Sequence, residues 1–362
     1  MARLGLSPLF STLFANDFDA AKAAAYQANF GSPDFHLGDV HALTSGDLPG
    51  RAVLAWASSP CQDFSLAGKR EGLKGSRSSA FYGFWSLMQA LDDEGRAPDV
   101  IVVENVIGLL TSHRGADLAA LLAALKGRGY RAGALEVDAS AFSPQSRPRL
   151  FIVAARRLVP ELVGEGPFGP FHSQRLVRAI RALPKKASED FVWWRLPAPP
   201  RRNHDLIDLL EPDDAVPWHG PDRSARLLSL LSGAHRERLD TELVSGQRRI
   251  GAIFRRTRQE GGQKVQRAEI RFDGLAGCLR TPGGGSSKQF VAVLEGGKAR
   301  TRDLTPRECA RLMGLPDSDV LPRAVGGALH LCGDGVSVPA VRFLAENLLV
   351  KLARMCGKPV NP

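Results

Sequence analysis

VLAWASSPCQDFS, residues 53–65, is the stretch that decides the fold. It opens with a short apolar run, Val53 to Ala57, which small polar residues and Pro60 bring to an end. A short apolar run closed by turn residues is typical of a buried β-strand. Cys61 follows the strand directly, so we expect it at the carboxyl edge of a sheet, where open α/β folds carry their chemistry.

Cys61 has two interpretations on this basis. A single cysteine is about as often a small, inert core residue as a functional one. A nucleophilic cysteine has an ordinary pKa of about 8.5, so it needs a positive or hydrogen-bonding neighbourhood to form useful thiolate. Other segments of the chain decide between the two interpretations.

Two further apolar strands place polar side chains at the same edge. IVVENVIGLL, residues 101–110, ends its apolar run in Glu104, which supplies a carboxylate. FSPQSRPRLFIVAAR, residues 142–156, enters its strand through a Gln-x-Arg-x-Arg stretch that contains Arg147 and Arg149. Because arginine stays protonated in proteins, these two side chains supply fixed positive charge.

RDLTPRECARLMGLPD, residues 302–317, carries the signature of a helix start. Thr305 stands at the cap, Pro306 at the first helical position and Glu308 three residues after the cap. This spacing predicts a capping box, in which the two side chains satisfy backbone N–H groups that the first turn leaves without partners.

Taken in this order and spacing, the four segments resemble the DNA (cytosine-5)-methyltransferase family, and in particular its type II modification methyltransferases. The resemblance implies a Pro-Cys-Gln cysteine that attacks the base, a Glu-Asn-Val glutamate that holds it, and Gln-x-Arg-x-Arg arginines that surround it. The matching catalytic residues here are Cys61, Glu104, Arg147 and Arg149. Of the two arginines, we expect Arg149 at the carbonyl oxygen of the base and Arg147 as the one that orients the surrounding loops.

The same resemblance implies S-adenosylmethionine as cofactor, S-adenosylhomocysteine as product, and no metal. ANDFD at 15–19 is similar to the family's ribose segment, GDV at 38–40 to its adenine segment and GDGVSVPAV at 333–341 to its last motif. By themselves, carboxylates such as Asp17 and Asp39 are more often caps or turn residues. The cofactor-binding residues that the resemblance implies are Asp17, Phe18, Asp39, Val40, Pro60, Asp334 and Val336.

Two departures from the family pattern qualify the resemblance. The family opens with a Phe-x-Gly-x-Gly-Gly turn beside the methionine end of the cofactor, and no such run precedes ANDFD. We therefore expect a first strand and its glycine loop upstream of Met1. The second departure is Asp334-Gly335, where the family has Asn-Ala, and it keeps a polar group on the cofactor side.

Positive charge is concentrated in the middle of the chain. Residues 171–300 hold 24 Lys and Arg against 15 Asp and Glu, which accounts for 9 of the net charge of +10. Without the catalytic motifs a solvated face would be the better interpretation. With them we expect a surface that binds phosphates and reads base edges. The expected DNA-binding residues there are Arg248, Arg249, Arg255, Arg256, Arg258, Lys264 and Lys288, and the resemblance adds Gln62 and Ser65 at the phosphate of the target nucleotide.

Composition is that of a soluble enzyme with more than one lobe. The chain has 362 residues, and 44% of them are apolar, which is enough for a sizeable core. No apolar run approaches the ~20 residues that span a bilayer, and the N-terminus lacks a signal-peptide pattern. The five cysteines show no paired spacing. We therefore expect a cytoplasmic protein without disulfides or a zinc site.

Two kinds of organisation follow along the chain. Up to about residue 157, short apolar strands at 9–15, 52–57, 99–104, 133–138 and 149–155 alternate with helical stretches at 19–30, 78–93 and 115–127. This alternation predicts an α/β fold with a mostly parallel, Rossmann-like sheet and helices on both faces. Clusters of Pro, Gly and Trp then indicate a smaller irregular domain. We expect a catalytic domain at 1–165, a target-recognition domain at 166–320 and a C-terminal segment at 321–362 that returns to the catalytic domain as a helix.

The sequence thus predicts a sequence-specific DNA (cytosine-5)-methyltransferase of a restriction-modification system. It would act on a flipped-out cytosine in double-stranded DNA through a covalent Cys61 adduct. We expect a monomer, with any cognate restriction endonuclease acting separately. Two alternatives stay open: a catalytically impaired DNA-binding relative, and a tRNA cytosine-5 methyltransferase of the same fold.

Overall fold

The computed structural model describes residues 1–58, 80–281 and 288–355, and these form parts of two compact units. The large unit comprises Arg3–Asp138, Pro148–Pro199 and Ala340–Pro362, and the small unit comprises Met1–Ala2, Ala139–Arg147 and Pro200–Pro339. Both units are discontinuous in sequence. The functional domains expected at 1–165, 166–320 and 321–362 rest on composition and motifs, and they stay a prediction.

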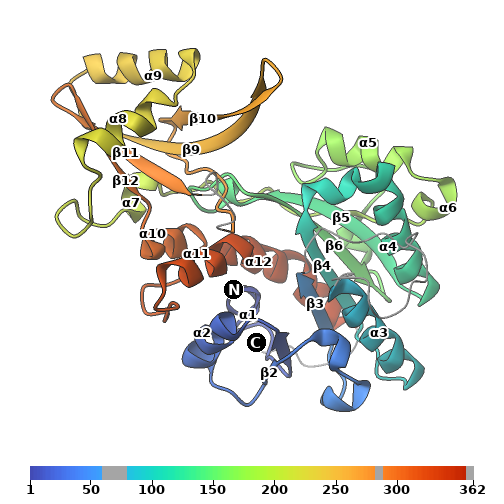
Figure 1. Cartoon of the computed structure of the whole chain (residues 1–362). Coiled ribbons are helices and arrows are strands. Elements are labelled where there is room, and N and C mark those ends of the chain that lie inside the picture. Colours follow the sequence, from blue (N-terminus) through green and yellow to red (C-terminus); the bar gives the residue numbers. More distant parts are fainter. Residues whose placement is uncertain (59–79, 282–287, 356–362) are drawn as a thin grey trace. The chain divides into compact units, whose positions relative to one another are not determined.

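A four-stranded sheet lies at the centre of the large unit, with strand order β3–β4–β6–β5 (Figure 1). Its strands are β3 (Leu54–Ser58), β4 (Val100–Val106), β5 (Arg131–Asp138) and β6 (Pro148–Ala155). β3 and β4 are parallel, whereas β6 is antiparallel to both of its neighbours. The predicted α/β class is confirmed. The sheet is mixed because the short connection between β5 and β6 allows antiparallel pairing, which a helical crossover does not.

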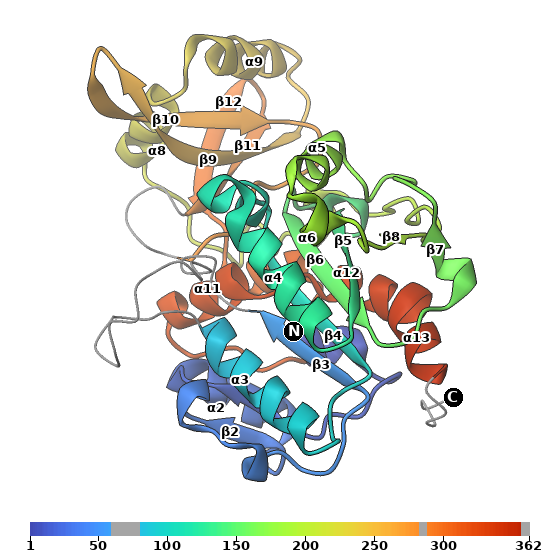
Figure 2. The same cartoon turned by 90° about the vertical axis from the view of Figure 1, so that its right-hand side faces the viewer.

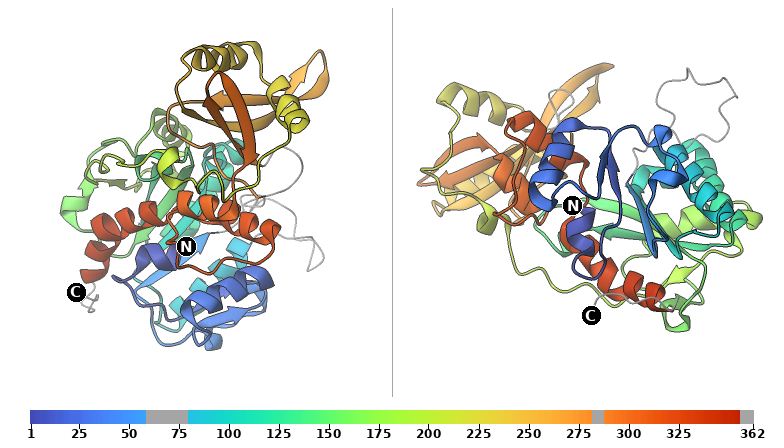
Figure 3. Two further views of the ribbon diagram at one scale, coloured as in Figure 1. Left: turned by 90° about the vertical axis from the view of Figure 1, so that its left-hand side faces the viewer. Right: turned by 90° about the horizontal axis from the view of Figure 1, so that it is seen from below.

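Helices cover both faces of this sheet. One core cluster joins β4, β5 and β6 to α3 (Ala80–Asp93), α4 (Ala116–Gly127) and α5 (Gln174–Ala182). Figure 2 shows α3 and α4 in front of the strands, and Figure 3 shows the C-terminal helix α13 (Val350–Arg354) on the opposite face. Because both faces are covered, β4 is buried from Val100 to Asn105, as its apolar run predicts.

The C-terminal segment forms the helix that its periodicity predicts. α12 (Val338–Leu344), a π-helical stretch (Ala345–Leu349) and α13 follow one another without a break. The predicted apolar positions Val341, Leu344, Leu348 and Leu352 are all buried. Within the large unit, Arg342 donates to the carbonyl groups of Leu4 and Gly5, so the two ends of the described chain are held together there.

The N-terminal region differs from its prediction in one element. The strand expected at 9–15 is wrong, because the strand β1 (Ala15–Asp17) begins only at Ala15. Its parallel partner β2 (Phe35–Leu37) is three residues long, so it cannot pair a longer strand. α1 (Ala2–Leu6) and α2 (Ala20–Phe30) flank β1. The large unit also contains β7 (Val163–Gly164), β8 (Trp193–Trp194) and α6 (Lys185–Ser188).

The small unit is built on an antiparallel sheet with strand order β10–β9–β11–β12. Its strands are β9 (Arg249–Glu260), β10 (Gln263–Arg271), β11 (Gln289–Glu295) and β12 (Lys298–Asp303). Its helices are α7 (Leu206–Leu209), α8 (Pro221–Ser229), α9 (Gly233–Val244), α10 (Pro306–Leu312) and α11 (Val325–Asp334). Leu227 of α8 and Leu239 of α9 pack with Ile253 and Ile270 of the sheet, which gives this unit its own core.

The predicted helix start at Thr305 is confirmed. Thr305 caps α10 by accepting from the Glu308 N–H at 3.1 Å, and the Glu308 carboxylate accepts from the Thr305 N–H at 2.9 Å. Both carboxylate oxygens of Glu308 also accept from Arg302 at 2.7 Å. This pair is almost fully buried, and its hydrogen bonds offset the cost of removing two charges from water.

Across the described ranges, no helix is both long and apolar enough to cross a bilayer.

Candidate active site

The carboxyl end of β4 brings Glu104 against Arg149 of β6. In the antiparallel pair, Glu104 lies opposite Phe151 and Val106 lies opposite Arg149, so Glu104 and Arg149 are diagonal neighbours on one face. Their Oε1 and Nε atoms are 3.3 Å apart, and their side chains are only 7% and 15% exposed. A carboxylate and a guanidinium therefore meet at the strand ends with little solvent between them.

This arrangement has a clear electrostatic consequence. Opposite charges 3.3 Å apart attract each other strongly here, because both side chains are largely buried and little water lies between them to screen the pair. Arg149 also donates from Nη1 to the Pro148 carbonyl at 3.0 Å, which helps to fix its direction. The pair thus presents one acceptor and one fixed donor group at a single edge of the sheet.

β3 supplies the third strand end of this region. Ser58, its last residue, lies opposite Glu104 in the parallel β3–β4 ladder. Cys61 comes three residues later in the sequence. Cys61 lies outside the described residues, as do the expected Pro60, Gln62 and Ser65.

Arg147 has surroundings quite different from those of Arg149. It belongs to the small unit, is 1% exposed, and donates to the carbonyl oxygens of Leu279 at 2.6 Å, Gly333 at 2.8 Å and Gly335 at 2.6 Å. Both terminal nitrogens of its guanidinium are therefore bound to backbone. These contacts join the segment before β6 to residues more than a hundred positions later in the chain.

Gln145 extends the same network, and sequence reasoning assigned it no role. Its side chain is fully buried, donates to the Leu312 carbonyl at 3.1 Å and accepts from the Leu279 N–H at 3.2 Å. Gly333, whose carbonyl accepts from Arg147, leaves no room for a side chain, because a Cβ at that position would lie 2.4 Å from the Thr281 nitrogen. The Gln-x-Arg part of the motif thus binds backbone, and the final arginine meets Glu104.

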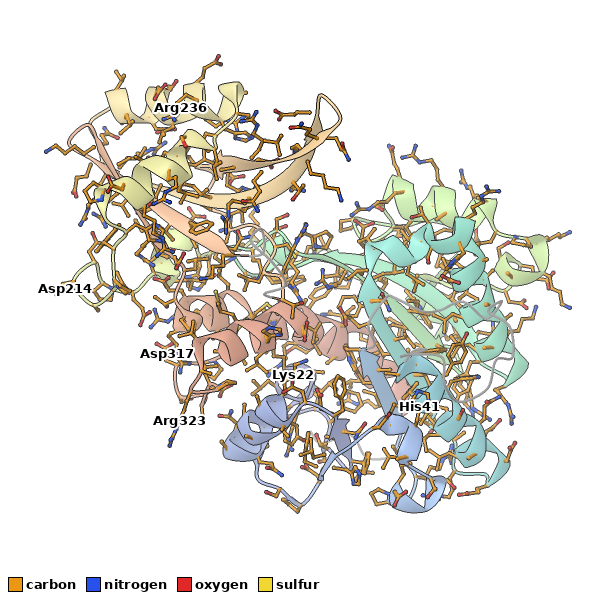
Figure 4. All side chains as sticks on the ribbon, viewed as in Figure 1. Lys22, His41, Asp214, Arg236, Asp317 and Arg323 are labelled. Carbon is orange, nitrogen blue, oxygen red and sulfur yellow. The ribbon has the colours of Figure 1, made fainter. Side chains whose placement is uncertain are left out.

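The expected nucleoside-binding residues of the large unit come together at the ends of β1 and β2. The Gly38 N–H donates to the Asp17 carbonyl at 3.0 Å, which ties the two loops together. The Asp17 carboxylate accepts from the Asp19 N–H at 2.9 Å, and Asp39 accepts from the His41 N–H at 2.9 Å. Figure 4 labels His41 in this region.

Phe18 and Val40 complete this group. Val40 follows Asp39 directly and is half-buried, whereas the Phe18 ring is 75% exposed. Phe18 follows Asp17 directly, so an aromatic side chain open to water stands next in sequence to a carboxylate, which can accept hydrogen bonds.

The remaining expected cofactor residues belong to the small unit. Asp334, at the end of α11, accepts from the Thr281 hydroxyl at 2.9 Å. Val336, two residues later in the sequence, is buried. No group of three or more His, Cys, Asp or Glu side chains with the arrangement of a metal site occurs in the described part of the chain.

Most of the expected DNA-binding residues form ion pairs inside the small unit. Arg248 pairs with Asp213 and Glu295, Arg249 with Glu242, Lys288 with Asp303, and Arg256 and Arg258 both with Glu269. Surface pairs of this kind contribute only about 0 to 1 kcal/mol, so a phosphate can replace the carboxylate.

Arg255 and Lys264 differ from the other five. The Arg255 guanidinium lies 5.2 Å from the Phe290 ring centre and donates to the Gln266 side chain at 3.5 Å. Lys264 is exposed and has no acidic partner among the residues that the structure describes. The acidic partners of the arginines, Glu269 above all, escaped sequence reasoning because the strand register that brings them together is not visible in the sequence.

Comparisons with known proteins place these observations in a family context. The sequence profile of the family described as C-5 cytosine-specific DNA methylase matches residues 2–350. The type II methyltransferase M.HhaI of Haemophilus parahaemolyticus is 25% identical over 338 residues, covering 93% of this chain and 86% of that protein. The type II methyltransferase M.NlaX of Neisseria lactamica is 25% identical, covering 99% of this chain and 96% of that protein.

Solved structures show the same fold. The crystal structure of S. pombe Dnmt2 methyltransferase has a TM-score of 0.58 at 15% identity and covers 98% of this chain and 95% of its own. That of a Spodoptera frugiperda DNMT2 mutant has a TM-score of 0.60 at 17% identity, with the same coverage.

Proposed function

We propose, from the premise that the chain belongs to the C-5 cytosine-specific DNA methylase family, that it transfers a methyl group from S-adenosylmethionine to carbon 5 of cytosine in duplex DNA. The observation that carries this proposal is the largely buried Glu104–Arg149 pair at the ends of β4 and β6. The end of β3, next to that pair, leads within three residues to Cys61.

Carbon 5 of cytosine is too weakly nucleophilic to accept a methyl group directly. The Cys61 thiolate would add to carbon 6, and the ring electrons would move to carbon 5, which becomes enamine-like. S-adenosylmethionine supplies the methyl group as an electrophile. A proton acceptor then removes the proton from carbon 5. The bond between sulfur and carbon 6 breaks, and Cys61 leaves as thiolate.

Glu104 and Arg149 would assist the addition step. A protonated Glu104 carboxyl group would donate to ring nitrogen 3 and so favour attack at carbon 6. The Arg149 guanidinium would stabilise the charge that develops on the carbonyl oxygen of the base.

The target cytosine would have to leave the helix. Inside a duplex both faces of the ring are stacked, so a thiol and a methyl donor cannot reach carbons 6 and 5 together. Gln62 and Ser65, which flank Cys61 in the sequence, are our proposed contacts to the phosphate of the flipped nucleotide. Residues 166–320, with their basic side chains, are the proposed target-recognition domain.

The methyl donor fits the residues at the ends of β1 and β2. The Asp17 carboxylate would accept from ribose hydroxyls, Asp39 from the adenine amino group, and the exposed Phe18 ring would stack on adenine. Val40, Pro60, Asp334 and Val336 are the further proposed contacts.

A methyl-transfer assay tests the proposal. The purified chain is incubated with S-adenosylmethionine carrying a labelled methyl group and with either plasmid DNA or tRNA. We expect label in DNA, none in tRNA, and no label in DNA with the Cys61→Ser variant, which should still bind DNA in a gel-shift assay. Label in tRNA alone, or turnover by Cys61→Ser, would overturn the proposal; DNA binding without transfer by the unmodified chain would favour a catalytically impaired relative.

A further inference from the structure

β9 and β10 continue beyond the sheet of the small unit as a two-stranded ribbon (Figure 1). β11 pairs with β9 only as far as Phe254, whereas β10 pairs with β9 up to Glu260. Gly261 and Gly262, with φ of 55° and 80°, close the ribbon in a tight two-residue turn. A ribbon of this kind has the dimensions to enter the major groove of DNA.

The two faces of the ribbon carry different side chains. Residues directly opposite each other in an antiparallel pair point to the same face. Ile253 and Arg255 share one face with Ala268 and Ile270, and that face joins the core of the small unit. The other face carries Phe254, Arg256 and Arg258 from β9, and Arg267 and Glu269 from β10.

Arg256 is held in one direction by two contacts on this second face. Its Nε donates to the Glu269 carboxylate at 3.1 Å, and its guanidinium carbon lies 5.1 Å from the centre of the Phe254 ring. The other oxygen of Glu269 accepts from Arg258, and Glu269 itself is only 15% exposed. A carboxylate fixed in this way orients the arginine beside it.

The terminal nitrogens of the Arg256 side chain can donate hydrogen bonds to a ligand. The carboxylate takes Nε, so the terminal pair of nitrogens, Nη1 and Nη2, donates to no acceptor that the described residues provide. The side chain is 46% exposed. A pair of parallel N–H donors matches the O6 and N7 acceptors of guanine in the major groove. Figure 4 shows nitrogen-tipped side chains along this ribbon, below the helix that carries the labelled Arg236.

Resting on the proposed function, we infer that Arg256 reads a guanine in the DNA sequence that this protein recognises, and that Glu269 is its positioning residue. A phosphate would accept any cationic side chain, whereas a pre-oriented pair of donors discriminates between base edges. The recognised sequence therefore contains a guanine in addition to the target cytosine.

Arg267 offers a matched control on the same face. It lies directly opposite Arg256 and carries the same charge. Its Nε and Nη2 both donate to Glu260, so its own carboxylate occupies two of its nitrogens side by side. That carboxylate is 44% exposed, whereas Glu269 beside Arg256 is only 15% exposed, so Arg267 lacks the buried partner that holds Arg256 in one direction.

The test selects bound duplexes from a random DNA library, a readout that does not depend on methyl transfer. We expect the unmodified chain to enrich sequences with an invariant guanine at one position. Arg256→Lys should lower the preference for guanine at that position alone by about 10- to 100-fold. Glu269→Gln should lower the same preference by a smaller factor, and Arg267→Lys should leave it unchanged.

Three outcomes would overturn the inference: no enriched guanine with the unmodified chain, an unaltered preference in Arg256→Lys, or an equal loss in Arg267→Lys. Thermal unfolding of each variant separates a misfolded protein from a change in base preference. Because the selection measures binding, the inference can fail while methyl transfer is found, and it can hold where methyl transfer is not.

Discussion

Two arginine–glutamate pairs of the same chemistry lie in different surroundings in this molecule. Glu104 and Arg149, in the large unit, are 7% and 15% exposed, with the nearest charged atoms 3.3 Å apart. Glu269 and Arg256, on the ribbon of the small unit, are 15% and 46% exposed, with a separation of 3.1 Å. The two pairs have similar separations but differ in how far water reaches their side chains. We propose that the first pair takes part in the chemistry at the target cytosine and that the second offers hydrogen-bond donors to the major groove.

The largest expected effect separates the two glutamates. Glu104→Gln removes a group that can exchange a proton with the base, so we expect methyl transfer to fall by at least about 100-fold. Glu269→Gln keeps the site of chemistry intact, so transfer on the preferred sequence should fall by less than about tenfold. Initial rates with labelled S-adenosylmethionine measure both, and equal losses in the two variants would remove the distinction.

The Arg147→Met variant tests whether this fully buried arginine stabilises the folded protein. Arg147→Met leaves the carbonyl groups of Leu279, Gly333 and Gly335 without their donor in a buried site, so we expect a loss of about 3 kcal/mol in the free energy of unfolding. Urea unfolding followed by circular dichroism gives this value. Arg267→Met, at an exposed pair, should change it by less than about 1 kcal/mol. A stability close to that of the unmodified chain would refute the role of Arg147 in holding this backbone.

The salt dependence of DNA binding tests whether the ribbon of β9 and β10 contacts phosphates. Lys264 is exposed and would neutralise one phosphate, so Lys264→Ala should lower the slope of log affinity for DNA against log salt by about 1. Lys298→Ala, at the first residue of β12, should leave the slope unchanged. Fluorescence anisotropy with a labelled duplex measures both slopes. If the two variants behaved alike, the ribbon would not be the surface that meets the phosphates.

The smallest expected effect concerns a third pair, Arg175 and Glu136, whose side chains are 50% and 11% exposed. Burial alone would raise the pKa of Glu136, but hydrogen bonds from Arg175 and Ser173 and the charge of Arg175 outweigh it, so its pKa lies below the usual value. A lowered pKa in the folded state contributes stability above the unfolded pKa of about 4.3, and this contribution is lost as the pH falls below that value. Arg175 is half exposed, so the contribution should stay below about 1 kcal/mol.

Glu136→Gln isolates this contribution. The variant should be slightly less stable than the unmodified chain at pH 7, and the difference should shrink as the pH approaches 3. Urea unfolding at a series of pH values measures it. A difference that stays constant with pH would show that the carboxylate charge has no part in it.

Elements that are marked by a short run of apolar residues or by a capping motif could be predicted from the sequence. The apolar runs at 52–57, 99–104 and 149–155 correspond to β3, β4 and β6, and the Thr305 capping box starts α10 as predicted. The strand expected at 9–15 was wrong, since an apolar run there does not reveal that β2, which pairs with β1, is three residues long. The antiparallel direction of β6 likewise depends on pairing and not on the run itself.

The candidate site was likewise predictable from the sequence only in part. The meeting of Glu104 with Arg149 followed from motifs at strand ends, because strand pairing fixes where the side chains at those ends lie. Cys61 lies outside the described residues, and its place at this edge stays a prediction. The carbonyl partners of Arg147 lie more than 130 positions away in the chain, and the grip of Glu269 on Arg256 depends on a cross-strand register. Neither leaves a local trace in the sequence.

The formation of a covalent bond between Cys61 and cytosine is the central claim, and mass spectrometry tests it most directly. The chain is incubated with S-adenosylmethionine and a duplex whose cytosines carry fluorine at carbon 5. Fluorine cannot leave as the proton does, so sulfur should stay bonded to carbon 6. We predict a species heavier by the oligonucleotide, cross-linked at Cys61 and absent from Cys61→Ser. Cross-linking at another residue, or methylation of ordinary DNA by a chain that forms no such species, would contradict the account.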